Sequence, residues 1–270
     1  MRKDAEIDDA DQAMIDKAIR KTFRAFGFDV VRFHRDGPGY PPDFGQEETD
    51  IIRKVRPWTA TSPERIYALI QAVRYVSRNA IEGAIVECGV WKGGSMAAVA
   101  RTLLLARDPK RDLYLFDTFE GMSAPTERDS DYSGRQASDI LRDDPSSRGD
   151  DAPLELVRNV LHETGYPKEK VHFIKGKVEE TIPAQAPASI ALLRLDTDWY
   201  ESTKHELAHL FPRLSEGGAI IIDDYGHWRG SRQACDEYFA QTRTPILLHR
   251  IDYTGRIALK PFSPGARCES

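Results

Sequence analysis

Apolar positions along the chain change their spacing in a regular way, and this spacing predicts which segments are helices and which are strands. Ser62 can cap free N–H groups, Pro63 suits the first helical position, and apolar residues at helical spacing extend this helix to about Asn79. Strands and helices then alternate. We expect strands at residues 85–90, 112–117, 171–176, 190–196 and 219–223, and helices at residues 95–106, 154–164, 202–214 and 231–241.

This alternation predicts an α/β fold of the doubly wound kind. Continuous apolar runs such as residues 219–222 are typical of strands that helices cover on both faces, as in a parallel sheet. Residues 246–251 and 256–260 flank a turn signal at 252–255, which predicts a hairpin and an antiparallel strand. We therefore expect a sheet that is mixed at one end.

Two stretches depart from the alternation. Residues 1–57 combine an amphipathic piece at about 13–28 with turn residues at 37–42, and we interpret them as a helical, lid-forming appendage to a main domain at residues 58–270. Within that domain, residues 121–151 are polar and rich in Asp, Ser, Arg and Pro. So long an insertion is either a functional lid or a disordered loop.

The composition excludes several classes of protein. The chain has 270 residues, with 38 Lys and Arg against 43 Asp and Glu, and its net charge of -5 argues against binding to nucleic acid or anionic membranes. Cys88, Cys235 and Cys268 are too far apart in sequence to indicate a zinc knuckle or a disulfide framework. We find no signal peptide and no apolar run of membrane-spanning length, so we expect a soluble, cytoplasmic protein.

The first predicted strand ends in a glycine-rich loop at residues 89–95, and ligands of doubly wound sheets bind beyond such strand ends. Trp91 stands where the dinucleotide fingerprint has its second glycine, and the sequence has no phosphate-binding Gly-Lys-Ser or Gly-Lys-Thr here. S-adenosylmethionine is then the remaining common occupant. Asp117 ends the next strand, where it can accept hydrogen bonds from a ribose, and Gly176 and Val178 follow where an adenine would lie. An ordinary tight turn is the alternative.

Acidic residues follow two further strands. Asp196 and Asp198 end the fourth predicted strand, and Asp223 and Asp224 end the fifth. Sequential strands are usually neighbours, so these carboxylates should converge and raise one another's pKa values unless a cation compensates them. Oxygen ligands favour Mg²⁺. The alternative is that each aspartate only caps the next helix.

Residues 205–209 also match a zinc metalloprotease pattern, with His205 and His209 one helical turn apart and Glu206 between them. A zinc hydrolase needs a third ligand. Pro212 and Ser215 stand where the extended motif has glycine and histidine. We therefore interpret the histidines as surface residues of a helix.

Five segments together resemble the macrocin O-methyltransferase family, whose enzymes methylate sugar hydroxyls in macrolide and aminocoumarin antibiotic pathways. The resemblance covers residues 57–261. The segments are TATSPER at 59–65, VECGVWKGGS at 86–95, FDTFEGM at 116–122, LDTDWYEST at 195–203 and DDYG at 223–226.

The resemblance implies a class I S-adenosylmethionine-dependent methyltransferase, with a Rossmann-like, mixed seven-stranded sheet and helices on both faces. It implies S-adenosylmethionine as the methyl donor and Mg²⁺ held by Asp196, Asp223 and Asp224. Asp198 matches the family's general base, and His227 is the alternative base. The positions that match cofactor contacts are Thr61, Ser62, Glu87, Gly89, Gly93, Ser95, Asp117, Gly176 and Val178.

By the same resemblance, the reaction is methylation of a sugar hydroxyl in a glycosylated natural product. Residues 40–56 and 121–151 fall where the family has mobile lids. We expect a homo-oligomer that takes a small-molecule glycoside as acceptor and binds neither nucleic acid nor a membrane. A non-catalytic S-adenosylmethionine-binding module on the same fold is the alternative.

Overall fold

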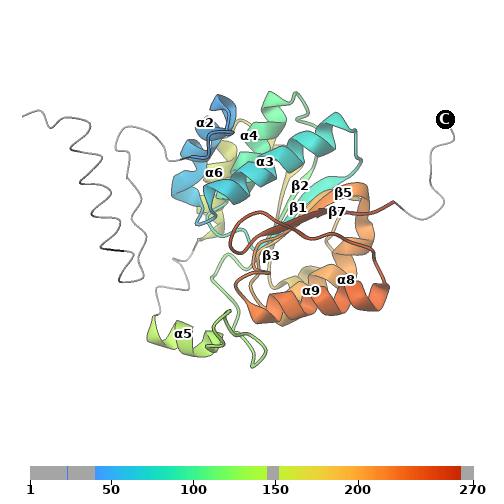
Figure 1. The fold of residues 1–270 in the computed structure, drawn as a ribbon. Coiled ribbons are helices and arrows are strands. Elements are labelled where there is room, and N and C mark those ends of the chain that lie inside the picture. Colours follow the sequence, from blue (N-terminus) through green and yellow to red (C-terminus); the bar gives the residue numbers. More distant parts are fainter. Residues whose placement is uncertain (1–22, 24–39, 145–151, 263–270) are drawn as a thin grey trace, which may run out of the picture. The chain divides into compact units, whose positions relative to one another are not determined.

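The computed structural model describes Phe23, residues 40–144 and residues 152–262 (Figure 1). Phe44–Ser270 form one compact unit, and Met1–Asp43 belong to another. Most of the predicted amphipathic piece at 13–28, and the end of the predicted insertion at 145–151, lie outside the described residues. No helix in the described part of the chain has the length and apolar character needed to cross a membrane.

The larger unit is built on one mixed sheet of seven strands in the order β3-β2-β1-β4-β5-β7-β6. The strands are β1 (Ala84–Cys88), β2 (Leu113–Asp117), β3 (Val171–Lys175), β4 (Ile190–Leu195), β5 (Leu214–Ile222), β6 (His249–Arg250) and β7 (Arg256–Leu259). The first five are parallel, while β7 is antiparallel to both β5 and β6. The expected mixed sheet, with its antiparallel hairpin at one end, is confirmed.

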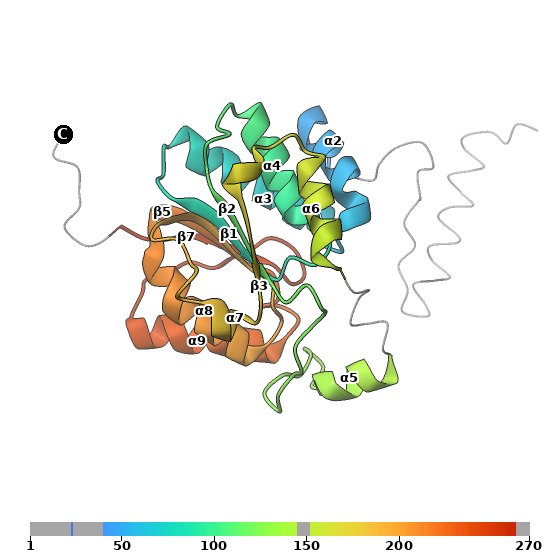
Figure 2. The same ribbon diagram turned by 180° about the vertical axis from the view of Figure 1, so that it is seen from behind.

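Helices cover both faces of the sheet, as predicted. They are α2 (Gln46–Val55), α3 (Pro63–Arg78), α4 (Gly94–Leu105), α5 (Ala137–Asp143), α6 (Leu154–His162), α7 (Val178–Thr181), α8 (Tyr200–Leu210) and α9 (Arg229–Thr242), with short 3₁₀ turns at Arg56–Trp58, Lys168–Lys170 and Phe211–Arg213. Helices α2, α3, α4 and α6 lie on one face, and α7, α8 and α9 lie on the other (Figures 1 and 2). All residues of β1 and β4 are therefore buried.

Helix α2 belongs to the larger unit, although the sequence assigned its residues to an appendage ending at residue 57. Its apolar face, Ile51, Ile52 and Val55, is buried, and the helix contacts α3 and α4. Burying that face stabilises the helix against the core. The compact unit therefore begins at Phe44.

Strand β5 begins five residues before its predicted start. Leu214 pairs with Ile190 and Ala219 with Leu192, so the register shifts in between. This irregularity lies at residues 215–218, where Ser, Glu and two Gly interrupt the apolar run. The apolar pattern alone therefore detected only the second half of the strand.

The described part of the insertion, residues 121–144, contacts the rest of the larger unit near the end of β5 and the start of α8. Asp131 forms an antiparallel bridge with Trp228, which lies between β5 and α9. Asp129 is fully buried, and its Oδ1 accepts the N–H of Tyr200, the first residue of α8, at 2.8 Å. The polar residues of this segment thus bind its turns to the sheet edge that carries the acidic residues.

Candidate active site

The ends of β1 and β4 meet at the glycine loop. Gly89 has a φ of +80°, and a Cβ at this position would lie 1.9 Å from the carbonyl oxygen of Asp196, so only glycine fits. The N–H of Asp196 donates to the carbonyl of Cys88 at 2.8 Å. The loop backbone is therefore in direct contact with the first residue after β4.

Asp117 fixes the shape of the glycine loop from the end of β2. Its Oδ2 accepts the N–H groups of Val90 and Trp91 at 2.6 and 3.0 Å, and its Oδ1 accepts that of Phe119 at 2.7 Å. A carboxylate oxygen can accept more than one hydrogen bond, so these contacts leave capacity for a ribose hydroxyl.

A cavity of about 290 Å³ lies beside this loop. Six of the nine predicted cofactor residues line it: Thr61, Gly89, Ser95, Asp117, Gly176 and Val178. The sequence did not predict its aromatic walls, which come from Trp91, Phe116, Phe119 and Trp199. A cavity with flat apolar walls and carboxylates at its edge suits a nucleoside with polar ends.

The other three predicted cofactor residues do not line the cavity. Ser62 caps α3, and its hydroxyl donates to Asp252 at 2.6 Å. Gly93 allows close packing, because a Cβ there would lie 2.9 Å from a methyl group of Val157. Glu87 is fully buried in β1. These three support the cavity from outside.

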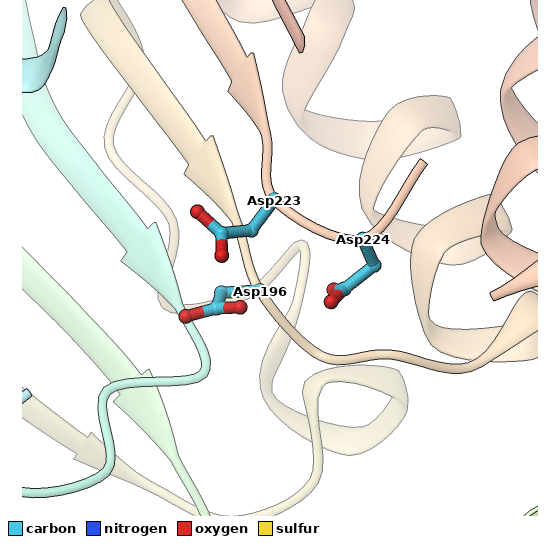
Figure 3. Close-up of side chains that lie close together, drawn as sticks. All are labelled: Asp196, Asp223 and Asp224. Carbon is cyan, nitrogen blue, oxygen red and sulfur yellow. The ribbon is translucent and has the colours of Figure 1, made fainter. Parts of the chain in front are cut away.

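Three aspartates from neighbouring strands lie together at the same edge of the sheet (Figure 3). Asp196 follows β4, Asp223 and Asp224 follow β5, and each offers an oxygen within 4.8 Å of the others. The N–H of Asp223 donates to the carbonyl of Leu195 at 2.9 Å, which continues the pairing of the two strands. Within the described ranges, this is the one group of three or more His, Cys, Asp or Glu residues that could hold a metal ion.

Arg194 binds several of these carboxylates from inside β4. Its side chain is 3% exposed, and it donates to Asp196 and Asp223 at 2.8 and 2.7 Å. It also donates to Glu87 at 2.5 Å. Arg65 pairs with the other oxygen of Asp223. The sequence analysis missed both arginines, although a single charged residue inside the apolar run of β4 was a visible signal.

The site holds more carboxyl groups than guanidinium groups. We call Glu87, Asp196, Asp198, Asp223 and Asp224 the carboxylate cluster. Burial raises the pKa of Asp196 well above its ordinary value, with Arg194 opposing the shift and Asp223 adding to it. Burial likewise raises the pKa of Glu87 to about 7 against the opposing effect of Arg194. Five carboxylates face two guanidinium groups, so a bound cation would relieve the repulsion.

Asp198 lies beside the three aspartates in a constrained conformation. Its φ is +65°, its N–H donates to Asp224 at 3.0 Å, and its Oδ1 accepts the indole N–H of Trp228 at 2.7 Å. Burial, and then the charge of Asp196, raise its pKa to about 7. The geometry therefore holds a carboxylate with high proton affinity at the edge of the cavity.

His227, the alternative base, does not contact Asp198. Its ring packs against Tyr132 and Trp228, with centroids 5.7 and 4.8 Å apart. Burial lowers its pKa, so the imidazole is neutral at neutral pH. Trp228, rather than His227, donates the hydrogen bond to Asp198.

The zinc-protease pattern on α8 does not form a metal site among the described residues. His205 bonds the carbonyl of Ile182 at 2.9 Å, and His209 packs beside it. Glu206 is fully buried and accepts the hydroxyl of Thr197 at 2.9 Å. The three side chains therefore do not converge.

The sheet order and the glycine loop after β1 define a class I S-adenosylmethionine-dependent methyltransferase, and solved structures agree. The O-methyltransferase NovP is 30% identical, with a TM-score of 0.66 over 79% of this chain and 88% of that one. The calicheamicin methyltransferase CalS11 shows the same fold at 19% identity and a TM-score of 0.56, over 86% of this chain and 99% of that one.

The model of the family "Macrocin-O-methyltransferase (TylF)" matches residues 49–259, and the chain belongs to this family. The 8-demethyl-8-(2,3-dimethoxy-alpha-L-rhamnosyl)-tetracenomycin-C 4'-O-methyltransferase of Streptomyces olivaceus is 32% identical over 216 residues, 78% of this chain and 80% of its own. The demethyldecarbamoylnovobiocin O-methyltransferase of Streptomyces niveus is 30% identical over 230 residues, 82% and 86% of the two chains. The resemblance of the five sequence segments is confirmed.

Proposed function

We propose that this protein transfers a methyl group from S-adenosylmethionine to a sugar hydroxyl of a glycosylated natural product, with Mg²⁺ held by Asp196, Asp223 and Asp224. The observation that carries the proposal is the position of Asp198, which lies at the edge of the cavity and beside these three aspartates. The names of the relatives support it, since each is an O-methyltransferase and one name specifies a rhamnosyl group.

The donor set fits a hard divalent cation. All the available donors are carboxylate oxygens, which Mg²⁺ prefers. Arg194 engages only one oxygen of Asp196, and the two guanidinium groups leave part of the negative charge of the carboxylate cluster uncompensated. When bound, Mg²⁺ would act as a Lewis acid and lower the pKa of the acceptor hydroxyl group.

Asp198 is the proton acceptor in this proposal. The hydrogen bond from Trp228 orients its carboxylate at the edge of the cavity, where it can act as a general base towards a hydroxyl group. The sugar oxygen forms a bond to the methyl carbon while Asp198 takes the hydroxyl proton. The electron pair of the broken carbon–sulfur bond goes to sulfur, which leaves S-adenosylhomocysteine.

The cavity residues bind and orient the donor. Asp117, the last residue of β2, lies beside the glycine loop, where it can accept ribose hydroxyls, and Gly176 and Val178 offer a small surface for adenine. Holding donor and acceptor in line contributes a large part of the acceleration in such a displacement.

The test is methyl transfer itself. The full chain is incubated with S-adenosylmethionine, MgCl₂ and a panel of deoxysugar glycosides, and S-adenosylhomocysteine and methylated products are quantified by mass spectrometry. We expect equal amounts of both with at least one glycoside. Tight binding of S-adenosylmethionine without a methylated product from any glycoside would contradict the proposal.

A further inference from the structure

Three aromatic side chains form a continuous surface beside the carboxylate cluster, and none of them lines the cofactor cavity. The ring of Tyr132 meets that of Tyr253 at 5.6 Å and 89°, and that of His227 at 5.7 Å and 61°. They come from the insertion, the β6–β7 hairpin and the segment after β5. We call Tyr132, His227 and Tyr253 the aromatic shelf.

The two tyrosines of the shelf expose most of their surface. Tyr132 is 55% and Tyr253 is 57% exposed. Large aromatic rings usually gain their stabilising effect by burial, and adjacent exposed rings mark surfaces that bind something else. Packing within the protein therefore does not explain these two rings.

The hairpin holds Tyr253 in a fixed position. The Oδ1 of Asp252 accepts the N–H groups of Thr254 and Gly255 at 2.9 and 2.8 Å, which closes the turn around the tyrosine. The Oδ2 of Asp252 accepts a hydrogen bond from Arg65 at 3.0 Å. Because the same guanidinium pairs with Asp223, the hairpin is tied to the carboxylate cluster.

Arg229 and Asp131 hold the backbone around Tyr132 in place. Arg229 donates its N–H to the carbonyl of Ser130 at 2.8 Å and its guanidinium to the carbonyl of Tyr132 at 3.0 Å. Asp131 closes this turn by accepting the N–H of Ser133 at 2.8 Å. A ligand would therefore meet a preformed surface, which lowers the entropy cost of binding.

Trp228 links the shelf to the candidate base. The ring of His227 meets that of Trp228 at 4.8 Å, and Trp228 bonds Asp198. Tyr132 is one ring contact further out than His227, and Tyr253 is one beyond that. A hydroxyl placed at Asp198 therefore leaves the more distant part of its molecule within reach of the shelf.

We propose that the aromatic shelf binds the aglycone of the methyl acceptor, and that this aglycone presents a flat aromatic or otherwise apolar face. The inference rests on the proposed function, because it takes the reacting sugar to lie at Asp198. Stacking and edge contacts with two tyrosine rings and an imidazole ring favour such a face over a polar one. The shelf is then a specificity determinant outside the reacting sugar.

The experiment compares two glycosides of the same sugar. Binding of 4-methylumbelliferyl α-L-rhamnoside and methyl α-L-rhamnoside to the full chain is measured with Mg²⁺ and S-adenosylhomocysteine present. We expect the aryl glycoside to bind about tenfold more tightly, and the doubly substituted Tyr132→Ala, Tyr253→Ala protein to lose that difference. Tyr132→Phe, which keeps the ring, should retain it.

Two controls show whether the aryl preference depends on the shelf itself. Phe262→Ala removes a ring that is 64% exposed outside the shelf and should change nothing. Affinity for S-adenosylhomocysteine should be equal in all variants, which shows that they are folded. Equal affinity of the wild-type protein for both glycosides, no binding of either, or an aryl preference that survives the double substitution overturns the proposal.

Two further readouts make the result unambiguous. Binding is measured without turnover, so failure of methyl transfer would contradict the proposed function and leave the shelf result standing. A second copy of this chain is the other molecule that could cover the shelf. Analytical ultracentrifugation of the double variant and the wild-type protein tests this by comparing their oligomeric states. A change of its oligomeric state, in place of the lost aryl preference, would assign the shelf to a contact between copies and overturn the proposal.

Discussion

The indole N–H of Trp228 donates a 2.7 Å hydrogen bond to Oδ1 of Asp198, which stands on a backbone with a φ of +65°. Such a conformation costs a residue other than glycine about 1–3 kcal/mol and persists only where the surroundings hold it. The N–H of Asp198 is bound to Asp224 at 3.0 Å. The candidate base is therefore held through both its side chain and its backbone.

Replacing Asp198 with Asn removes the proton acceptor but keeps an oxygen for the indole. We expect Asp198→Asn to lower kcat by about 10²–10⁴-fold in the methyl-transfer assay. Calorimetry should show unchanged affinity for S-adenosylhomocysteine. Trp228→Phe keeps the base and loses its orienting hydrogen bond, so its kcat should fall by about tenfold. Full activity of Asp198→Asn would exclude this residue as the base.

Removing the metal should stop turnover. We expect EDTA to abolish activity and added Mg²⁺ to restore it. At a Mg²⁺ concentration 100 times Kd, the free energy of unfolding should rise by about 2.7 kcal/mol, with a higher Tm. Asp224→Asn should remove that rise. His205→Ala should keep both responses, because its imidazole bonds the carbonyl of Ile182 outside the cluster. Undiminished turnover in EDTA would reject the metal site.

Gly89 and Gly165 provide a matched pair, since both have a φ of +80°. A Cβ on Gly165 meets nothing within 4 Å, so Gly165→Ala should cost only the backbone strain, about 1–2 kcal/mol. A Cβ on Gly89 would collide with the carbonyl oxygen of Asp196. Gly89→Ala should therefore destabilise the protein more in urea unfolding and weaken binding of S-adenosylmethionine. Equal effects of the two substitutions would show that the loop can move away from β4.

Glu206 should make stability depend on pH. Burial raises its pKa well above the ordinary value of 4.5, against the hydrogen bond from Thr197. The folded protein then binds more protons than the unfolded chain, so the contribution to stability is complete below 4.5 and is lost as pH rises towards the folded pKa.

We expect the free energy of unfolding of the wild-type protein to fall relative to that of Glu206→Gln as pH rises above about 5. The slope should not exceed about 1.4 kcal/mol per pH unit. Urea unfolding at a series of pH values measures it. Parallel curves for the two proteins would mean that Glu206 is ionised in the folded state.

Periodicity located most elements because the central strands are buried on both faces. Every residue of β1 and β4 is buried, so each appears as a short apolar run. The pattern failed where pairing crosses an irregularity, as in the first half of β5. The zinc-protease pattern at residues 205–209 was rejected on its missing third ligand, but the pattern did not predict that Glu206 is buried, because helical spacing does not show which face of α8 turns inward.

The acidic residues of the site could be predicted because they directly follow strands, and ends of neighbouring parallel strands meet. Two of their partners, Arg65 and Trp228, could not be predicted. Arg65 is 158 residues from Asp223 in sequence, and the contact exists only once α3 lies across the sheet edge. Trp228 likewise reaches Asp198 across 30 residues. The homo-oligomer, the cytoplasmic location and the lid roles of residues 40–56 and 121–151 stay predictions.

Arg65 connects the carboxylate cluster to the hairpin that carries Tyr253, because it pairs with both Asp223 and Asp252. Asp252, at the base of the hairpin, shares this guanidinium with Asp223, so its replacement would alter the charge balance around the reacting atoms. Tyr253, at the tip, contributes its ring to the aromatic shelf and has no ion pair with Arg65. If the shelf binds the aglycone as proposed, an exchange of Tyr253 changes the surface offered to the aglycone, while an exchange of Asp252 in the same four-residue turn changes the ion pairs of Arg65.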